Sequence, residues 1–148
     1  PEAAYQSLTQ ITAIELLARG MHWMATDAAC ANQAFNLTNG DVFRWSTVWP
    51  QLAHAFGLPC GTVRPMRLAQ TLADAGEVWE RIVQRHQLQS LALDQVADWP
   101  YLDATLARTW DEILSTNKAR SYGFHDWADS ETQLLETLGT YQQANILP

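Results

Sequence analysis

Apolar residues recur along most of the chain at intervals of three and four, which is the spacing of one face of an α-helix. The first predicted helix carries such a stripe, made of Ile14, Leu17, Ala18, Met21, Met24 and Ala25. Capping-box patterns at Thr12–Glu15 and Ser130–Gln133 predict where the first and last helices begin. Altogether the pattern predicts helices over residues 14–28, 46–56, 67–75, 77–87, 102–114 and 130–143, and a shorter helical turn over 115–122.

The run Ala34–Thr38 does not follow the helical spacing. It is short and apolar, it contains Phe35 and Leu37, and it predicts a brief buried strand. Asn39-Gly40 follows, and a turn is expected there because this dipeptide tolerates positive φ. A lone strand is unusual in a self-contained domain, since its edges need partners. It is expected at the end of an α/β protein whose main sheet lies upstream.

Proline and glycine positions set the expected limits of the helices. Pro50 is tolerated in the first turn of a helix, where its missing N–H would have no partner, so the N-cap is expected at or after about Ser46. Gly57, Gly76 and Gly123 are expected to end their helices. The fold class that follows is mostly α, with one or two short strands, in a single portion covering residues 1–148.

Composition narrows the function. Acidic residues outnumber basic ones by 16 to 9, giving a net charge of −7, and the single lysine and eight scattered arginines form no basic patch. This excludes a nucleic-acid-binding protein. Spanning a bilayer takes an apolar run of about 20 residues, and the chain has none. With no signal-peptide pattern either, we expect a cytoplasmic protein. The missing initiator methionine suggests processing or a fragment.

The cysteines and histidines carry no metal or redox motif. Cys30 and Cys60 are far apart and are expected to be free thiols. The histidines do not stand at zinc-ligand spacing, so no metal site is predicted; they are His22, His54, His86 and His125.

Several motifs, in order along the chain, carry a resemblance to a known family. They include Gln10-Ile11-Thr12, Phe35-Asn36, Asn39-Gly40-Asp41, Trp45 with Trp49, Leu52-Ala53, Phe56-Gly57, Val78-Trp79, Trp99-Pro100-Tyr101, Asn117-Lys118-Ala119-Arg120, Gly123-Phe124 and Ile146-Leu147-Pro148. The chain resembles the C-terminal part of the progesterone 5β-reductase and iridoid synthase-like branch of the extended short-chain dehydrogenase/reductases. The Asn-Gly-Asp motif with its two tryptophans is the most specific element.

The resemblance implies a parent enzyme with an N-terminal Rossmann domain that binds NADPH and reduces the activated C=C bond of an enone or a carbonyl. Its catalytic pair would be a Tyr-x-x-x-Lys motif. Here the only lysine is Lys118, and Leu114 stands four residues before it. No Gly-rich dinucleotide turn exists either. We therefore expect no catalytic and no cofactor-binding residue in this chain, which should be inactive alone.

The resemblance also points to a substrate pocket. The aromatic corner Trp99-Pro100-Tyr101 lies between predicted helices, and an aromatic at the Tyr101 position lines the pocket in the family. Trp99 and Tyr101 are therefore the candidate site residues, facing a small hydrophobic carbonyl or enone substrate. Packing in a core or on the surface is the alternative for Tyr101.

Two functions remain open from the sequence. The first is the substrate-covering C-terminal portion of a reductase whose Rossmann core is missing from these residues. The alternative is a free-standing helical binding or dimerisation module without catalysis. A third interpretation is a lone domain that self-associates to satisfy its strand edge. Without the Rossmann half, the apolar stripe of the first helix and the edges of Ala34–Thr38 should be exposed, which predicts a homo-oligomer of the fragment.

Overall fold

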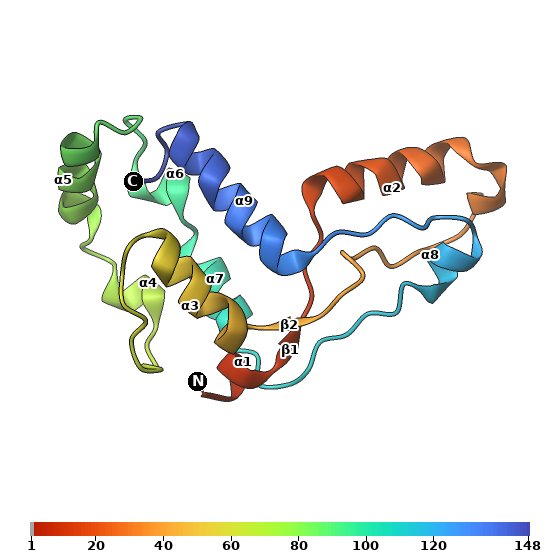
Figure 1. Cartoon of the computed structure of the whole chain (residues 1–148), viewed down its shortest axis with the longest axis horizontal. Helices are drawn as coiled ribbons and strands as arrows, with labels where there is room; N and C mark the ends of the chain where they lie inside the picture. Colours follow the sequence, from red (N-terminus) through yellow and green to blue (C-terminus); the bar gives the residue numbers. More distant parts are fainter. Residues whose placement is uncertain (1) are drawn as a thin grey trace.

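The computed structural model describes residues 2–148 (Figure 1). Its elements are α1 (Glu2–Gln6), β1 (Leu8–Thr9), α2 (Ile14–Thr26), the 3₁₀ turn η1 (Ala28–Cys30), β2 (Phe43–Arg44), α3 (Trp45–Ala55), α4 (Leu68–Thr71), α5 (Gly76–His86), α6 (Leu93–Val96), α7 (Trp99–Leu106), α8 (Asn117–Ser121) and α9 (Ser130–Gln143). The fold is mostly helical with two short strands, as predicted. None of the helices described has both the length and the apolar character needed to cross a membrane.

The elements form two lobes on either side of the β1–β2 pair (Figure 1). The α2 lobe holds α2 and α8 with the long loops beside them. The helical lobe holds α3 to α7 and α9, and within it α3 contacts α9 while α4 contacts α7. The two strands are antiparallel, with Leu8 opposite Arg44 and Thr9 opposite Phe43.

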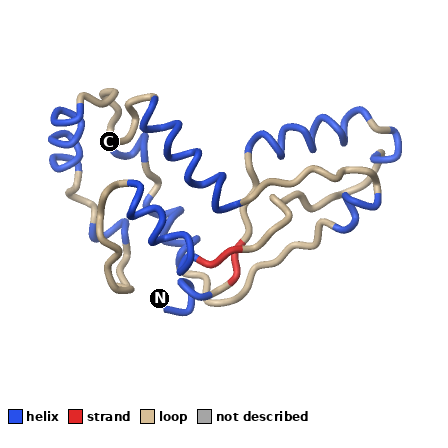
Figure 2. Tube along the Cα trace, in the orientation of Figure 1, coloured by secondary structure: helices blue, strands red, loops and turns tan. Residues whose placement is uncertain are grey.

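The predicted strand at residues 34–38 is wrong. The segment has no strand structure and runs as a loop (Figure 2). Phe35 and Leu37 do turn toward the core, as a buried strand would require. What is missing is a backbone ladder, because no neighbouring segment of residues 2–148 bonds to its N–H groups.

The start of α3 also differs from the prediction. The helix begins at Trp45, its N-cap is Arg44, and Pro50 is its sixth residue, in the second turn. Strand pairing explains the early start. The Arg44 guanidinium donates to the carbonyl of Gln6, and β2 pairs with β1, so the chain stays extended up to Arg44 and turns helical at once.

The glycine stops of α3 and α8 are confirmed. Gly57 has φ +65°, its N–H donates to His54, and the N–H of Leu58 donates to Ala53, both at 2.9 Å. Gly123, with φ +100°, ends α8 through an equivalent pair of backbone bonds: its N–H donates to Arg120 at 3.1 Å, and the N–H of Phe124 donates to Ala119 at 3.0 Å. These bonds satisfy carbonyls of the last helical turn, and the left-handed backbone they need favours glycine.

The helix predicted over 67–75 is shorter in the structure, where only α4 (Leu68–Thr71) is helical. Gly76 is the first residue of α5 and does not end the helix before it. The Asp103 carboxylate caps α4 by accepting the N–H groups of Leu68 at 2.7 Å and Ala69 at 3.0 Å. Asp103 lies in α7, so this long-range cap fixes where α4 starts.

The predicted helix over 102–114 and its preceding aromatic corner are replaced by α7. Trp99-Pro100-Tyr101 forms the first turn of α7, because the Asp98 carboxylate accepts the Tyr101 N–H at 2.9 Å and Pro100 needs no partner there. The helix ends at Leu106. Residues 107–116 do not continue the helix, because Leu8 bonds to the Asp111 side chain and to the backbone of Glu112 and so holds this segment beside β1.

Neither predicted capping box forms. The N-caps are Ala13 for α2 and Asp129 for α9, and Asp129 accepts the N–H of Thr132 at 2.8 Å. The Thr12 hydroxyl instead donates to the carbonyl of Leu37 at 3.0 Å. The Ser130 hydroxyl likewise turns away from its own helix to bond across the fold.

The buried core lies beneath α2. Leu16 is fully buried with Ala13, Ala119 and Phe124, and aromatic rings pack around this cluster. The ring of Trp23 lies 5.1 Å from that of Phe124. At Gly20 the approach of the next layer is so close that an added Cβ would lie 2.4 Å from Leu37 Cδ1.

The apolar stripe predicted on α2 faces away from this core. Ile14 is 79% exposed, Met21 58% and Leu17 41%. Leu16 and Gly20 occupy the inward side instead. The helix is therefore apolar on two sides, and only one of them is covered by residues 2–148. We call Ile14, Leu17 and Met21 the outer face of α2.

Candidate functional site

Asn39 joins three segments that are distant in sequence. It is 1% exposed, and its carboxamide oxygen accepts the N–H of Ala13 at 2.6 Å. Its Nδ2 donates to the Ser130 hydroxyl at 3.1 Å. On the backbone, its N–H donates to Ile11 at 2.9 Å and its carbonyl accepts from Ala128 at 3.0 Å. The start of α2, the turn and the start of α9 are thereby held together.

Asp41 completes this network. Its carboxylate accepts the backbone N–H of Ser130 at 2.8 Å and the Ser130 hydroxyl at 2.5 Å. Gln10 bonds to the carbonyl of Asp41 at 3.1 Å through Nε2 and accepts the N–H of Leu114 at 2.6 Å through Oε1. We call Gln10, Asn39, Asp41 and Ser130 the polar hub. Its side chains bond to one another and to nearby backbone groups, so the Asn-Gly-Asp motif has a structural role here.

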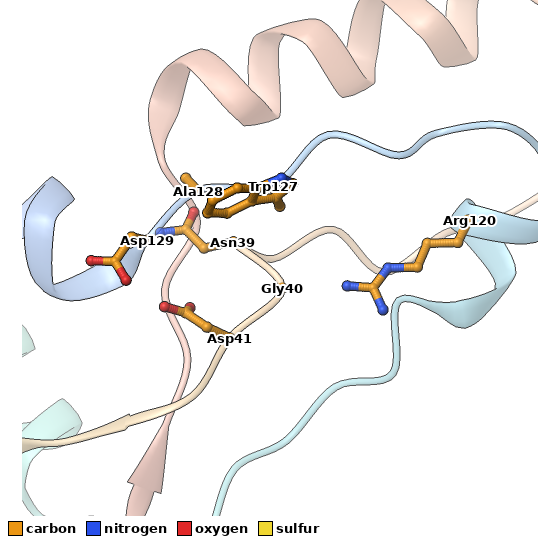
Figure 3. A pocket seen from close by; sticks show the side chains of 7 residues that line it. All are labelled: Asn39, Gly40, Asp41, Arg120, Trp127, Ala128 and Asp129. Carbon is orange, nitrogen blue, oxygen red and sulfur yellow. The ribbon is translucent and has the colours of Figure 1, made fainter.

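A small cavity of about 230 Å³ opens beside the hub (Figure 3). Its lining consists of Asn39, Gly40, Asp41, Arg120, Trp127, Ala128 and Asp129. Gly40 has φ +99° and lies against the end of the Arg120 side chain, 3.1 Å from the place of an added Cβ. A side chain at this position would be strained and crowded.

The carboxylates of this cavity are already engaged. Asp41 bonds to Ser130, and hydrogen bonds from the side chain and backbone of Thr132 lower the pKa of Asp129. The lining contains no histidine, cysteine, serine or lysine. The cavity lining therefore holds no nucleophile of these types beside a general base.

A larger cavity of about 420 Å³ lies in the helical lobe. Its lining consists of Leu72, Ala73, Gly76, Leu93, Asp94, Ala97, Asp98, Trp99 and Pro100. Most of these groups are apolar, and the Asp98 carboxylate is occupied in capping α7. The lining of this cavity is therefore mostly apolar, as is typical of small-molecule pockets.

The structure separates the two predicted pocket residues. Trp99 is half-buried and lines the larger cavity. Tyr101 is 66% exposed and lines neither cavity. Leu72 and Leu93 were missed because they come from other helices, and no sequence signal brings them next to Trp99.

Lys118, the only lysine, contacts the segment before Asn39. Its ammonium donates to the carbonyl of Ala34 at 3.0 Å and lies 5.0 Å from the ring centroid of Phe35 and 5.9 Å from that of Tyr122. These contacts tie α8 to the segment before Asn39. Through residues 2–148, no group of three or more metal-ligating side chains is positioned to hold an ion. Cys30 and Cys60 are free thiols, as predicted.

Comparison with known proteins gives relatives along almost the whole chain, although no protein-family model matches it. An (S)-8-oxocitronellyl enol synthase of Nepeta racemosa is 34% identical over 139 residues, covering 90% of this chain and 34% of the relative. A short chain dehydrogenase of Penicillium aethiopicum is 33% identical, with 85% and 37% covered. A 3-oxo-Delta(4,5)-steroid 5-beta-reductase of Arabidopsis thaliana is 29% identical, with 98% and 38% covered.

The order of motifs found in the sequence therefore reflects common ancestry. The chain spans only about a third of the length of the relatives it matches. It belongs to the extended short-chain dehydrogenase/reductases, in the branch of the iridoid synthases and progesterone 5β-reductase.

Proposed function

We propose that this chain is the C-terminal, substrate-covering portion of a cytoplasmic NADPH-dependent reductase that acts on an enone or carbonyl of a small hydrophobic molecule. The observation that carries the proposal is the coverage: 90% of the chain matches an enol synthase of which it spans 34%. Most of that relative therefore lies outside the matched region. In this proposal the cofactor and the catalytic pair belong to the remaining part.

The chain's own residues support that division. Lys118 is the only lysine, it has no tyrosine four residues before it, and its ammonium is held among Ala34, Phe35 and Tyr122. A short-chain catalytic lysine would need to be free for its tyrosine and cofactor. The chain also has no Gly-rich turn for a dinucleotide.

The α2 outer face supports a larger parent protein. Ile14, Leu17 and Met21 present adjacent apolar side chains to solvent. Their spacing is that of a helix face that packs on another layer. In the proposed parent, the cofactor-binding part would cover this face.

The cavity beside Trp99 supports a role in substrate binding. Its walls come from the end of α4, the first residue of α5, α6 and the start of α7, and they include no residue of the polar hub. It would receive the apolar body of the substrate, while the reacting enone or carbonyl points toward the cofactor in the other part. Tyr101 lies in the same first turn of α7 and, being exposed, is free to face the substrate from there.

Steady-state kinetics of the longer parent protein test this proposal. NADPH-dependent reduction of a cyclic enone should be measured with the parent and with the 148-residue chain. The parent should reduce the enone with NADPH. The 148-residue chain alone should neither bind NADPH nor reduce the enone. A parent that lacks NADPH-dependent activity, or a natural reading frame that begins at Pro1, would contradict the proposal and leave the binding or dimerisation module.

Substitution in the parent tests the pocket. Trp99→Ala should raise KM for an apolar enone by about 10-fold, with kcat changed less. The substitution removes an apolar contact that the substrate would make equally in the ground state and in the transition state. Tyr101→Phe and Tyr101→Ala separate the hydroxyl from the ring. If both leave KM unchanged, Tyr101 does not contact substrate. Tyr141→Phe, on the exposed end of α9, is the matched control.

A further inference from the structure

Arg120 supplies the positive charge in the lining of the smaller cavity, and no group in residues 2–148 neutralises it. Its side chain makes no hydrogen bond and no ion pair with that part of the chain. A guanidinium stays charged at physiological pH and carries five N–H donors. This one lies close to the backbone, since an added Cβ at Gly40 would stand 3.1 Å from Arg120 Nη2. The guanidinium is therefore placed beside the turn with its donors still available.

The two carboxylates that line the same cavity are engaged with α9. Both oxygens of Asp41 accept from Ser130, one from its N–H at 2.8 Å and the other from its hydroxyl at 2.5 Å. Asp129 caps α9 by accepting the N–H of Thr132 at 2.8 Å. Figure 3 shows both carboxylates pointing away from the Arg120 guanidinium. The cavity thus keeps an uncompensated positive charge in a chain where acidic residues outnumber basic ones by 16 to 9.

Trp127 gives the cavity an aromatic wall and a second free donor. Its side chain is 71% exposed, and its indole N–H donates to no group in the described part of the chain. A carboxylate fits this pair of donors, because a guanidinium binds both of its oxygens and the indole N–H adds a further bond. A phosphate fits less well, since its larger charge would meet stronger repulsion from Asp41 and Asp129.

The cavity lies beside the outer face of α2. Ala13 and Ala128 both bond to Asn39, so Ile14, which follows Ala13, and Trp127, which precedes Ala128, flank the same buried residue. Ile14 is 79% exposed and Trp127 71%. The proposed function assigns the outer face to the cofactor-binding part of the parent, and the chain spans only about a third of its relatives' length. The same part of the parent can therefore reach the cavity.

We propose that the cavity formed by Arg120, Trp127 and the Gly40 turn binds one carboxylate side chain, an aspartate or glutamate, from the part of the protein outside these 148 residues. The inference rests on the proposed function, since it needs the longer parent. The incoming carboxylate would neutralise the guanidinium and exclude water from the cavity, which strengthens the attraction between the two charges. Because Asn39 and Asp41 belong both to the cavity and to the polar hub, this ion pair would fix the hub against the other part of the parent.

A cross-link from Arg120→Lys in the parent identifies the partner directly. The substitution puts an amine at the cavity, and a water-soluble carbodiimide condenses an amine with a carboxylate that it contacts. Peptide mass mapping should locate the linked aspartate or glutamate outside residues 1–148. A link to Asp41 or Asp129 would show that the chain supplies its own carboxylate, and it would overturn the inference.

Arg85→Lys is the matched control for the cross-link. Arg85 is exposed, makes no side-chain bond within residues 2–148, and lies in the last turn of α5 as Arg120 lies in the last turn of α8. It should give no link to the carboxylate that Arg120→Lys captures. A link from both variants to the same residue would mean that the reaction is not specific to the cavity, and it would count against the inference.

Chemical protection of Arg120 gives a readout that needs no substitution. Phenylglyoxal modifies free guanidinium groups, and it should modify Arg120 at least about 10-fold more slowly in the parent than in the 148-residue chain, because only the parent covers the group. Arg85 should react at the same rate in both proteins. Equal rates for Arg120 in the two proteins would overturn the inference, whether or not a cross-link forms.

Thermal unfolding of Arg120→Gln measures what the ion pair contributes. The variant removes the charge and keeps a hydrogen-bonding side chain. It should lower the Tm of the parent by at least about 3 °C and that of the 148-residue chain by less than about 1 °C, since only the parent would be left with an unpaired carboxylate. Equal Tm shifts in the two proteins would contradict the inference.

Other occupants of the cavity and failure of the proposed function give different results. If the cross-link joins two copies of the parent, or if acetate slows the modification of a still reactive Arg120 in the parent, the carboxylate has another source and the inference is wrong. If the parent reduces enones with NADPH while Arg120 reacts equally in both proteins, the proposed function stands and only this inference fails. A cross-link in a parent without NADPH-dependent activity would support the carboxylate site and contradict the proposed function.

Discussion

The polar hub finds its hydrogen-bond partners within residues 2–148, whereas the same residues leave the outer face of α2 exposed to solvent. The hub gathers Gln10, Asn39, Asp41 and Ser130 from three parts of the chain, and each side chain bonds within the cluster. The outer face presents Ile14, Leu17 and Met21 to solvent. The start of α2 belongs to both, since Ala13 is bonded to Asn39 and Ile14 is exposed. Residues 2–148 thus supply hydrogen-bond partners for the hub but leave the outer face of α2 exposed.

Substitution of Asn39 tests most directly how much the polar hub contributes to stability. Asn39→Ala leaves the buried Ala13 N–H without its acceptor and removes one of the two hydrogen bonds of the Ser130 hydroxyl, which still donates to Asp41. We expect the free energy of unfolding to fall by about 3 kcal/mol, since a buried unpaired group costs about 1–3 kcal/mol and a lost hydrogen bond about 1 kcal/mol. Urea unfolding of the 148-residue chain, followed by tryptophan fluorescence, measures the change.

Asn36→Ala is the matched control for Asn39→Ala. Its exposed amide makes a single 3.4 Å bond, so the same substitution should change stability by less than about 0.5 kcal/mol. If the two variants lose equal stability, the hub is not what holds the three segments together.

Gly20 tests how tightly α2 is fixed to the segment before the hub. Gly20→Ala places a methyl group 2.4 Å from Leu37 Cδ1. Overpacking costs about 1–3 kcal/mol, and alanine returns about 1 kcal/mol of helix propensity, so we expect a net loss of about 1 kcal/mol. Urea midpoints measure it.

A double variant checks the cause. Leu37→Ala removes the clashing atom, so Gly20→Ala should stabilise the Leu37→Ala background. A simple sum of the two single losses would mean that α2 does not press on Leu37.

The outer face should respond in the opposite way. Met21→Lys in the 148-residue chain should change the free energy of unfolding by less than about 0.5 kcal/mol, because Met21 is 58% exposed. It should nevertheless reduce self-association, which we predict for the isolated chain because its apolar face is uncovered. Sedimentation velocity over a concentration series measures the distribution of species.

Glu15→Gln on the same helix is the control for charge, since it also adds one positive unit to the net charge. It should leave the sedimentation profile unchanged. A wild-type chain that sediments as a clean monomer at high concentration would contradict the predicted association.

The helices were largely predictable, because their apolar spacing is local. The hub was not: Asn39 was read as a turn residue, and its bonds reach Ala13 and Ser130, which are 26 and 91 positions away. For the same reason the capping boxes failed. Ser130 had a better partner in Asp41 than in its own helix. Long-range partners leave no periodic signal in a sequence.

The sequence could point to only part of the larger cavity. Trp99 was chosen because it flanks Pro100 in the expected aromatic corner, and it lines this cavity, whereas most of the other lining residues come from the end of α4, the start of α5 and α6. Tyr101 stands exposed because Asp98 caps α7 one turn earlier than the pattern indicated. The α2 stripe shows the opposite limit: periodicity found an apolar face correctly, yet it could not say which part of the protein covers that face.

The smallest expected effect concerns Asp129, at the start of α9 next to the hub. Hydrogen bonds from Thr132 lower the pKa of Asp129, so the folded state favours the ionised carboxylate. The resulting stabilisation is full above the unfolded pKa, near 3.9, and is lost as pH falls through the lower folded value. Asp129→Asn keeps a capping oxygen without titrating. Urea midpoints should therefore fall more steeply below about pH 4 for the wild type than for Asp129→Asn. Parallel curves would mean that the cap holds equally well when protonated, and that the hub side of α9 does not depend on this charge.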